Sequence, residues 1–178
     1  MPNYPDIIER LLLQTDLMTI LIPTEPINRD LLERVRKLDP AELAEGQEIK
    51  NESMLVLLKG ALFFGLDALD EAHKIFQDGS GDLASYWHGM IHRRESDFDN
   101  ARYWFRRTGE LPFFSVLHRT ASNISPTMAR QSNWTPYLFT GQCEQVRFGD
   151  SDLKVECVAL QRAEFEKLLD YTWRQAVG

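Results

Sequence analysis

The 178-residue chain has little cysteine, and its apolar residues form no run long enough to cross a membrane. Cys143 and Cys157 fit no metal-binding or redox spacing, so we expect two buried, reduced thiols rather than a disulfide framework. Residues 1–23 mix apolar positions with charged and polar ones. This pattern is typical neither of a signal peptide nor of a membrane span, which needs about 20 apolar residues. The sequence therefore predicts a cytoplasmic protein with no membrane partner.

An excess of basic residues is also missing. The 27 acidic residues outnumber the 20 basic ones, and the formal net charge of -7 repels phosphate backbones and anionic lipids on average. We therefore expect no nucleic acid partner. The sequence also lacks a phosphate-binding loop, a glycine-rich nucleotide fingerprint and the Gly-x-Ser-x-Gly pattern of serine hydrolases. Known motifs therefore identify no catalytic residue.

Strand patterns are scarce, and helix patterns run from end to end. The nearest candidate for a strand is the short stretch EQVRFGD, residues 144–150. Residues that begin helices precede the apolar stretches; the predicted caps are Asp6, Asn28 or Asp30, Asp39, Asn133, and Asp150 or Ser151. Residues 112–134 mix turn formers with polar residues and are predicted to be an irregular connection. With 43% hydrophobic residues, the chain is predicted to be a single all-α domain spanning residues 1–178.

Two segments in the middle of the chain match each other at an offset of 29 residues. The first is LLKGALFFGLDALDEAHKIFQDG, and the second is YWHGMIHRRESDFDNARYWFRRTG. Small residues fall on small ones and large residues on large ones; the matched pairs include Gly60 with Gly89, Ala72 with Ala101, and Phe76 with Phe105. Antiparallel helices approach closely only where one of them presents a small side chain. We therefore expect two helical hairpins, at about residues 53–79 and 82–110, completed by flanking helices.

This pattern resembles the tetratricopeptide repeat, in which small and aromatic residues recur around a turn and a proline follows. The second segment supplies Gly89, Asp97, Phe98, Phe105 and Pro112 at the corresponding places. The offset of 29 is shorter than the ~34 residues of that repeat. Two units are also fewer than the three or so that a free-standing array needs, so flanking helices must complete the core. The resemblance implies a helical module that binds a partner.

A longer string, HGMIHRRESDFDNARYWFRR, resembles the signature of a family of uncharacterised bacterial and fungal proteins. Members share His-x-x-x-His-Arg-Arg-Glu, followed by Asn-Ala-x-Tyr-Trp-Phe-Arg-Arg. The upstream LDALDEAHKIFQD and the downstream LFTGQCE are similar to that family as well, so the resemblance spans most of the chain. The resemblance supports the all-α fold and the interpretation of this string as one unit, and it implies no activity.

His88 and His92 are four residues apart, which places both imidazoles on one face of a helix, close enough to share a metal ion. His73, from the preceding hairpin, is the predicted third ligand. Glu95 lies about 10 Å along the helix from His88, so we do not expect the two to share an ion. In the alternative, His92 packs in the core and His88 hydrogen-bonds a nearby carboxylate. A divalent metal is the one cofactor that the sequence suggests.

The arginines of the same string admit two interpretations. The predicted ligand-binding residues are Arg93, Tyr103, Trp104 and Arg107, together with the histidines and Glu95. Guanidinium and aromatic groups of this kind can hold a carboxylate or a phosphate. In the alternative, the arginines form surface ion pairs, such as Arg93 with Asp97, and offset the dipole at a helix end.

Two functions from different classes follow from these features. The first is a binding module, either for a partner peptide or protein or for a small anionic ligand beside the arginine and aromatic residues. The second is a metal-dependent enzyme that uses His88 and His92, with Glu95 as proton acceptor. An exposed face on the last helix would suit a homodimer.

Overall fold

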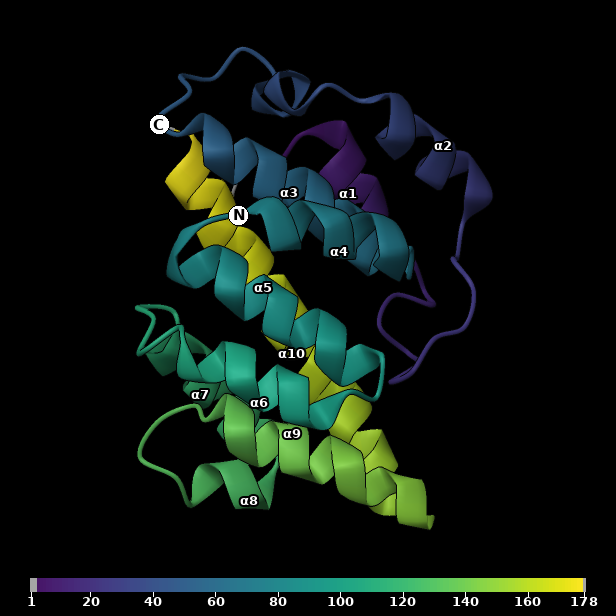
Figure 1. The fold of residues 1–178 in the computed structure, drawn as a ribbon, viewed down its shortest axis with the longest axis vertical. Helices are drawn as coiled ribbons and strands as arrows, with labels where there is room; N and C mark the ends of the chain where they lie inside the picture. The colour runs from purple at the N-terminus through teal and green to yellow at the C-terminus, as the bar shows by residue number, and fades with distance from the viewer. Residues whose placement is uncertain (1–2, 178) are drawn as a thin grey trace.

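The computed structural model describes residues 3–177, which form ten α-helices and two short 3-10 helices (Figure 1). In chain order these are α1 (Asp6–Leu12), α2 (Arg29–Lys37), η1 (Pro40–Ala44), α3 (Glu52–Gly65), α4 (Leu69–Asp78), α5 (Gly81–Arg94), α6 (Phe98–Arg106), α7 (Phe114–Ile124), α8 (Pro126–Ala129), α9 (Pro136–Gln145), η2 (Val146–Phe148) and α10 (Ser151–Ala176). Within this range there is no β-strand, and one isolated bridge joins Ile49 to Val177. The stretch EQVRFGD continues α9 into η2. The prediction of an all-α fold is confirmed.

The two predicted hairpins are α3 with α4 and α5 with α6, which pack against each other in chain order (Figure 1). In each hairpin, the two helices cross most closely at a glycine. A Cβ atom on Gly60 would lie 2.6 Å from a ring carbon of Phe76, and one on Gly89 would lie 2.7 Å from a ring carbon of Phe105. These distances are too short for carbon atoms, so only glycine permits this approach. The offset of 29 residues is therefore a packing repeat, while the resemblance to tetratricopeptide repeats stays a prediction.

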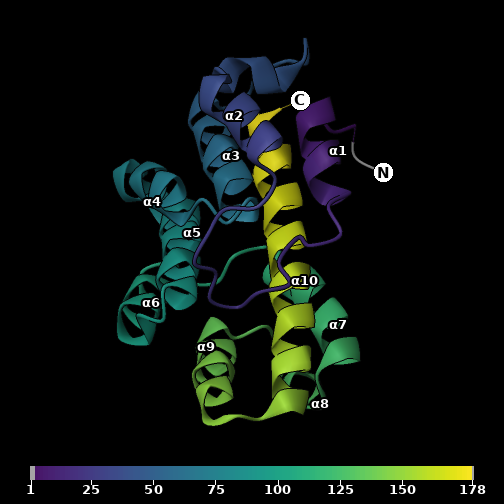
Figure 2. The same cartoon turned by 90° about the vertical axis from the view of Figure 1, so that its right-hand side faces the viewer.

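The long helix α10 supports both ends of the molecule. It runs along the longest axis, with α3 packed beside its C-terminal half and α7 and α9 beside its N-terminal half (Figure 2). Tyr86 and Trp87 of α5 reach it through hydrogen bonds to Glu164 and Thr172. As predicted, the last helix completes the core on which the two hairpins rest. No helix among residues 3–177 combines the length and the apolar content that a membrane crossing requires.

Several helices begin at the residues that the sequence indicates. The side chains of Asn28, Asp39 and Asp150 accept backbone hydrogen bonds at the starts of α2, η1 and α10. Asp6 does not cap α1, because it lies inside the helix and Pro5 precedes it. The predicted cap Asn133 is also wrong, since Thr135 caps α9.

The region of residues 112–134 differs from its prediction. It is not an irregular connection, because α7 and α8 occupy most of it. Phe114, Leu117 and Ala121 are buried, and they lie on one face of α7, which packs on α10. Their spacing of three and four residues is helical. Turn-forming residues in this region, such as Ser122, Asn123 and Pro126, favoured the prediction of a loop. Burial of the apolar face against α10 stabilises the helix.

Candidate metal centre

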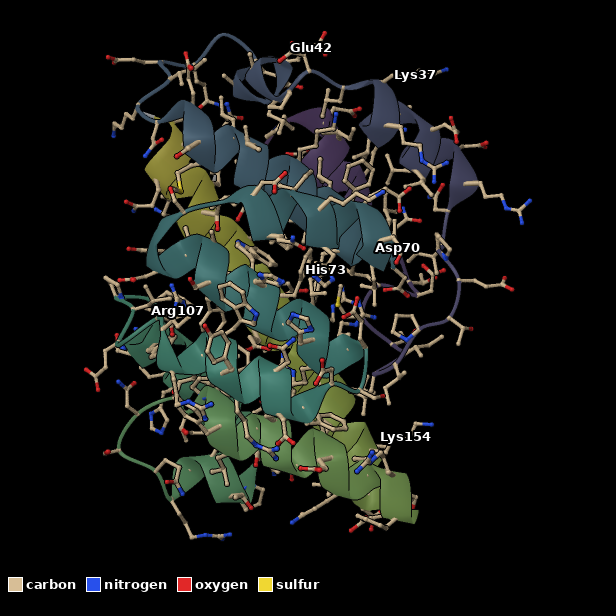
Figure 3. The ribbon with its side chains drawn as sticks, viewed as in Figure 1. Lys37, Glu42, Asp70, His73, Arg107 and Lys154 are labelled. Carbon is tan, nitrogen blue, oxygen red and sulfur yellow. The ribbon has the colours of Figure 1, made fainter. Side chains whose placement is uncertain are left out.

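Three histidines from two neighbouring helices face one another. His73 belongs to α4, and His88 and His92 lie four residues apart on α5. One ligand atom of each histidine can be chosen so that all three lie within 4.8 Å of one another. Figure 3 labels His73 at the packed boundary between α4 and α5. The structure therefore brings together the three residues that the sequence suggests as metal ligands.

The closest contact joins His73 and His88, whose Nε2 atoms are 3.0 Å apart. The centroids of the three imidazole rings form a nearly equilateral triangle with sides of 4.7, 4.9 and 4.8 Å. Nitrogen atoms bound to a tetrahedral zinc ion at about 2.0–2.1 Å are themselves roughly 3.3 Å apart. The 3.0 Å between the Nε2 atoms of His73 and His88 is close to this spacing, and the chosen ligand atoms of all three histidines lie within 4.8 Å of one another.

Glu95 lies directly after α5, and its carboxylate faces the outer nitrogens of the cluster. Oε1 lies 3.1 Å from Nδ1 of His73, and Oε2 lies 3.4 Å from Nδ1 of His92. Burial raises the pKa of the Glu95 carboxyl, but hydrogen bonds with His92 and His73 outweigh it and hold the pKa below its ordinary value. A carboxylate at Nδ1 is the usual partner of a histidine that binds metal through Nε2, because it fixes the tautomer and the ring orientation.

His88 lies at the buried side of the cluster, with 2% of its surface exposed. Trp104 of α6 stacks on its ring with centroids 4.1 Å apart. Burial, followed by the neighbouring His92 and His73, lowers the pKa of His88 to about 4. The ring is therefore neutral near pH 7, which is the form that binds metal. Among residues 3–177, His88 has no carboxylate partner of the kind that the structural alternative requires, and its hydrogen-bonding neighbour is His73.

His92 is buried as well and is surrounded by the turn between α5 and α6. Asn100 Nδ2 lies 3.2 Å from its Nε2, and Asp97 Oδ2 lies 3.7 Å from its Nδ1. Asp97 also caps α6. Sequence patterns did not single out Asn100 for this role, because an asparagine within a helix carries no signal of such a contact.

One side of the cluster is open to solvent. The side chain of His73 is 25% exposed and that of Glu95 is 30% exposed, whereas His88 and His92 are buried. A metal ion bound by the three histidines would thus be shielded by Trp104 on one side and reached from solvent beside His73.

Arg93 is not part of a surface anion site. Its side chain is 1% exposed and forms an ion pair with Glu164 of α10. Tyr86 donates a hydrogen bond of 2.6 Å to the same carboxylate, and Trp134 donates one of 2.7 Å to the Tyr86 oxygen. The predicted surface pair between Arg93 and Asp97 is therefore wrong, because Arg93 belongs to a buried network that joins α5 to α10. Sequence inspection did not identify Glu164, which lies 71 residues away along the chain.

Arg107 and Tyr103 contact each other at the surface of α6. The Arg107 guanidinium lies 5.8 Å from the ring centroid of Tyr103 and 5.5 Å from that of Trp104. Trp104 contacts both the Arg107 guanidinium and the ring of His88, so this surface adjoins the histidine cluster. An anion site here would lack Arg93, and the role as a binding module for a peptide, a protein or a small anion stays a prediction.

Comparison of the chain with protein-family models, with curated proteins and with solved structures finds no match. The two family resemblances therefore stay predictions, and the geometry of the side chains is what supports a function.

Proposed function

We propose that the protein binds one divalent transition metal ion through His73, His88 and His92. The triangle of three imidazoles is the observation that carries this proposal. Imidazole nitrogens suit zinc, copper, nickel and iron, whereas magnesium and calcium prefer oxygen ligands. Zinc is the first choice, because histidine is among its usual ligands in tetrahedral protein sites.

Three histidine ligands leave one position of a tetrahedral ion for water or a substrate. Catalytic zinc sites have this arrangement, whereas structural sites usually fill all four positions with protein ligands. The partial exposure of His73 gives solvent access to the cluster. The proposed role is therefore that of a metal-dependent enzyme, in which zinc would supply a bound water with a pKa of about 7. The contacts of Glu95 with two Nδ1 atoms favour a role in orienting the ligands over a role as proton acceptor.

Metal binding is tested by titrating purified, tag-free and metal-free protein with zinc. We expect one equivalent to bind, and we expect His88→Ala combined with His92→Ala to abolish it. His118→Ala is the matched control, because His118 contacts the Met128 carbonyl outside the cluster. Circular dichroism shows whether each variant keeps its helices. A double variant that is folded and still binds one equivalent would contradict the proposal.

Catalysis is tested separately, with activated carboxylic and phosphoric esters as probes. The zinc-loaded protein should hydrolyse at least one of these probes faster than the metal-free protein does. The zinc-supplemented double variant should match the metal-free rate. If zinc binds but the rates do not differ in this way, the proposed metal centre stands and the proposed enzymatic role is rejected.

A further inference from the structure

The histidine cluster lies on the side of α5 that faces away from α10. Tyr86 and Trp87 of α5 are hydrogen-bonded to α10, whereas His88 contacts His73 of α4 and Trp104 of α6. Figure 2 shows α4 and α6 farther from α10 than α5 is. A ligand of the cluster therefore approaches from the side on which α4 and α6 lie.

Trp104 connects the histidine cluster to a positive charge. Its ring stacks on His88 with centroids 4.1 Å apart, and the guanidinium of Arg107 lies 5.5 Å from the centroid of Trp104. Tyr103 packs against Trp104 at a centroid distance of 5.5 Å and is 45% exposed. Trp104 is half-buried. The two aromatic side chains therefore form a partly exposed apolar surface between the cluster and Arg107.

Arg107 keeps most of its hydrogen-bond donors available to a ligand. Ion pairs engage Arg93 and Arg94 of α5 and Arg102 of α6. Among residues 3–177, no ion pair of Arg107 is found. Its Nη1 donates one long hydrogen bond of 3.4 Å to the Tyr103 oxygen. A guanidinium has five N–H donors, so the exposed Arg107 can bind an anion.

We propose that the substrate of the metal centre is an ester with a carboxylate at its other end, and that Arg107 binds this carboxylate. This inference rests on the proposed metal centre, because the ester would face the open position of the ion while the carbon chain packs on Trp104 and Tyr103. A guanidinium binds a carboxylate through two parallel hydrogen bonds. A phosphate monoester would bring a second negative charge to a chain of formal net charge -7, which favours the carboxylate.

The reaction class is ester hydrolysis. The oxygen of water forms a bond to the acyl carbon, and the bond from that carbon to the alkoxy oxygen breaks. The alkoxy oxygen leaves as an alcohol with one proton of the water, and the remaining product is a dicarboxylic acid. Arg107 takes no part in these bond changes. Because Arg107 is exposed, we expect its carboxylate contact to give a Kd on the order of 1 mM.

Binding is tested with methyl hydrogen adipate, which has a carboxylate at one end and a methyl ester at the other. NMR follows the indole N–H signal of Trp104 in the zinc-loaded protein. We expect a saturable shift with this probe and none with dimethyl adipate, which lacks the charge. Arg107→Gln should weaken binding about three- to tenfold. Equal binding of the diester, or an unchanged affinity of a folded Arg107→Gln variant, would overturn the proposal.

Arg106→Gln is the matched control for Arg107→Gln. It removes the same charge from the neighbouring position, but Arg106 lines a different pocket, together with Trp134 and Tyr137. We expect this variant to bind methyl hydrogen adipate as tightly as the unmodified chain. Equal weakening by both substitutions would show a general effect of charge and would count against a specific site at Arg107.

A second measurement shows which end of the probe lies at the metal. Cobalt(II), a paramagnetic divalent ion, replaces zinc at the histidine cluster. We expect the ester methyl protons of methyl hydrogen adipate to relax faster than the methylene protons beside its carboxylate. The reverse order would overturn the proposal, because the carboxylate would then bind the metal itself. Zinc binding without a preference for the carboxylate overturns this inference alone, whereas a protein that binds no zinc overturns the proposed function and this inference with it.

Discussion

The Nε2 atoms of His73 and His88 lie 3.0 Å apart, although the residues belong to different helices and are 15 positions apart in the sequence. At this distance the Nε2–H of one imidazole donates its proton in a hydrogen bond to the Nε2 of the other. A metal ion would take the place of that proton, because both nitrogens must be deprotonated to act as ligands. The contact that joins α4 to α5 in the metal-free protein is therefore also the contact that would hold the ion.

The role of Glu95 predicts a change in metal affinity. Glu95→Gln keeps the shape of the side chain but removes the charge that faces Nδ1 of His73 and His92. We expect zinc affinity to fall by about 10- to 100-fold, because partners of this kind orient the ligand rings and raise their basicity. Competition with a chelating dye measures the change. Asp99→Asn, at a fully exposed carboxylate on α6, is the control. Equal affinities for both variants would remove Glu95 from the metal centre.

The environment of His88 predicts a dependence of stability on pH in the metal-free protein. Burial and the neighbouring histidines lower its pKa to about 4 in the folded state, whereas an unfolded chain has a value of about 6.5. Between about pH 6.5 and about pH 4, His88 is therefore protonated in the unfolded chain but stays neutral in the folded protein. The contribution of His88 to the free energy of unfolding is present above this range and is lost across it.

Urea unfolding at several pH values checks this dependence. Between pH 6.5 and 5, His88→Gln should lose less stability than the unmodified chain, because the titrating group is gone. If both proteins show the same slope, the folded-state pKa of His88 is close to its ordinary value.

The repeated glycine predicts opposite effects of the same substitution at two helical sites. A methyl group at Gly89 would meet the ring of Phe105 at 2.7 Å, whereas one at Gly141 of α9 would meet no atom within 4 Å. Gly89→Ala should destabilise the protein by about 1–3 kcal/mol through overpacking. Gly141→Ala should stabilise it by about 0.5–1 kcal/mol, because alanine favours the helix. Thermal unfolding measures both, and destabilisation by Gly141→Ala would contradict this account.

The buried pair of Arg93 and Glu164 predicts a large loss of stability when one partner is removed. Glu164→Ala leaves a buried guanidinium without its counter-ion and deprives Tyr86 of an acceptor. We expect a loss of about 3–5 kcal/mol. Glu166→Ala removes a carboxylate from an exposed pair with Arg162 on the same helix and should cost about 0–1 kcal/mol. Chemical denaturation compares the two, and similar losses would show that the buried pair is not a major stabilising contact.

The sequence predicted the helical hairpins well, because their signals are local. Glycine at one position and an aromatic residue 16 positions later recur in both units, as Gly60 with Phe76 and Gly89 with Phe105. The approach of His88 to His92 is equally local, because helical geometry alone places residues four apart on one face. Local patterns were misleading in α7, where turn-forming residues such as Ser122, Asn123 and Pro126 favoured a loop, although contact with α10 stabilises a helix.

The sequence by itself determined the all-α class, the two hairpins and the shared face of His88 and His92. Only the tertiary structure decided that His73 meets His88, that Glu164 neutralises Arg93, and that Trp104 stacks on His88. These contacts depend on how helices pack, and helices that are distant in the sequence carry no periodic signal of their partners. Arg93 shows the physical reason most clearly. By sequence alone an arginine could lie at a surface site or in a buried ion pair, and only the packing of the helices buries Arg93 beside Glu164.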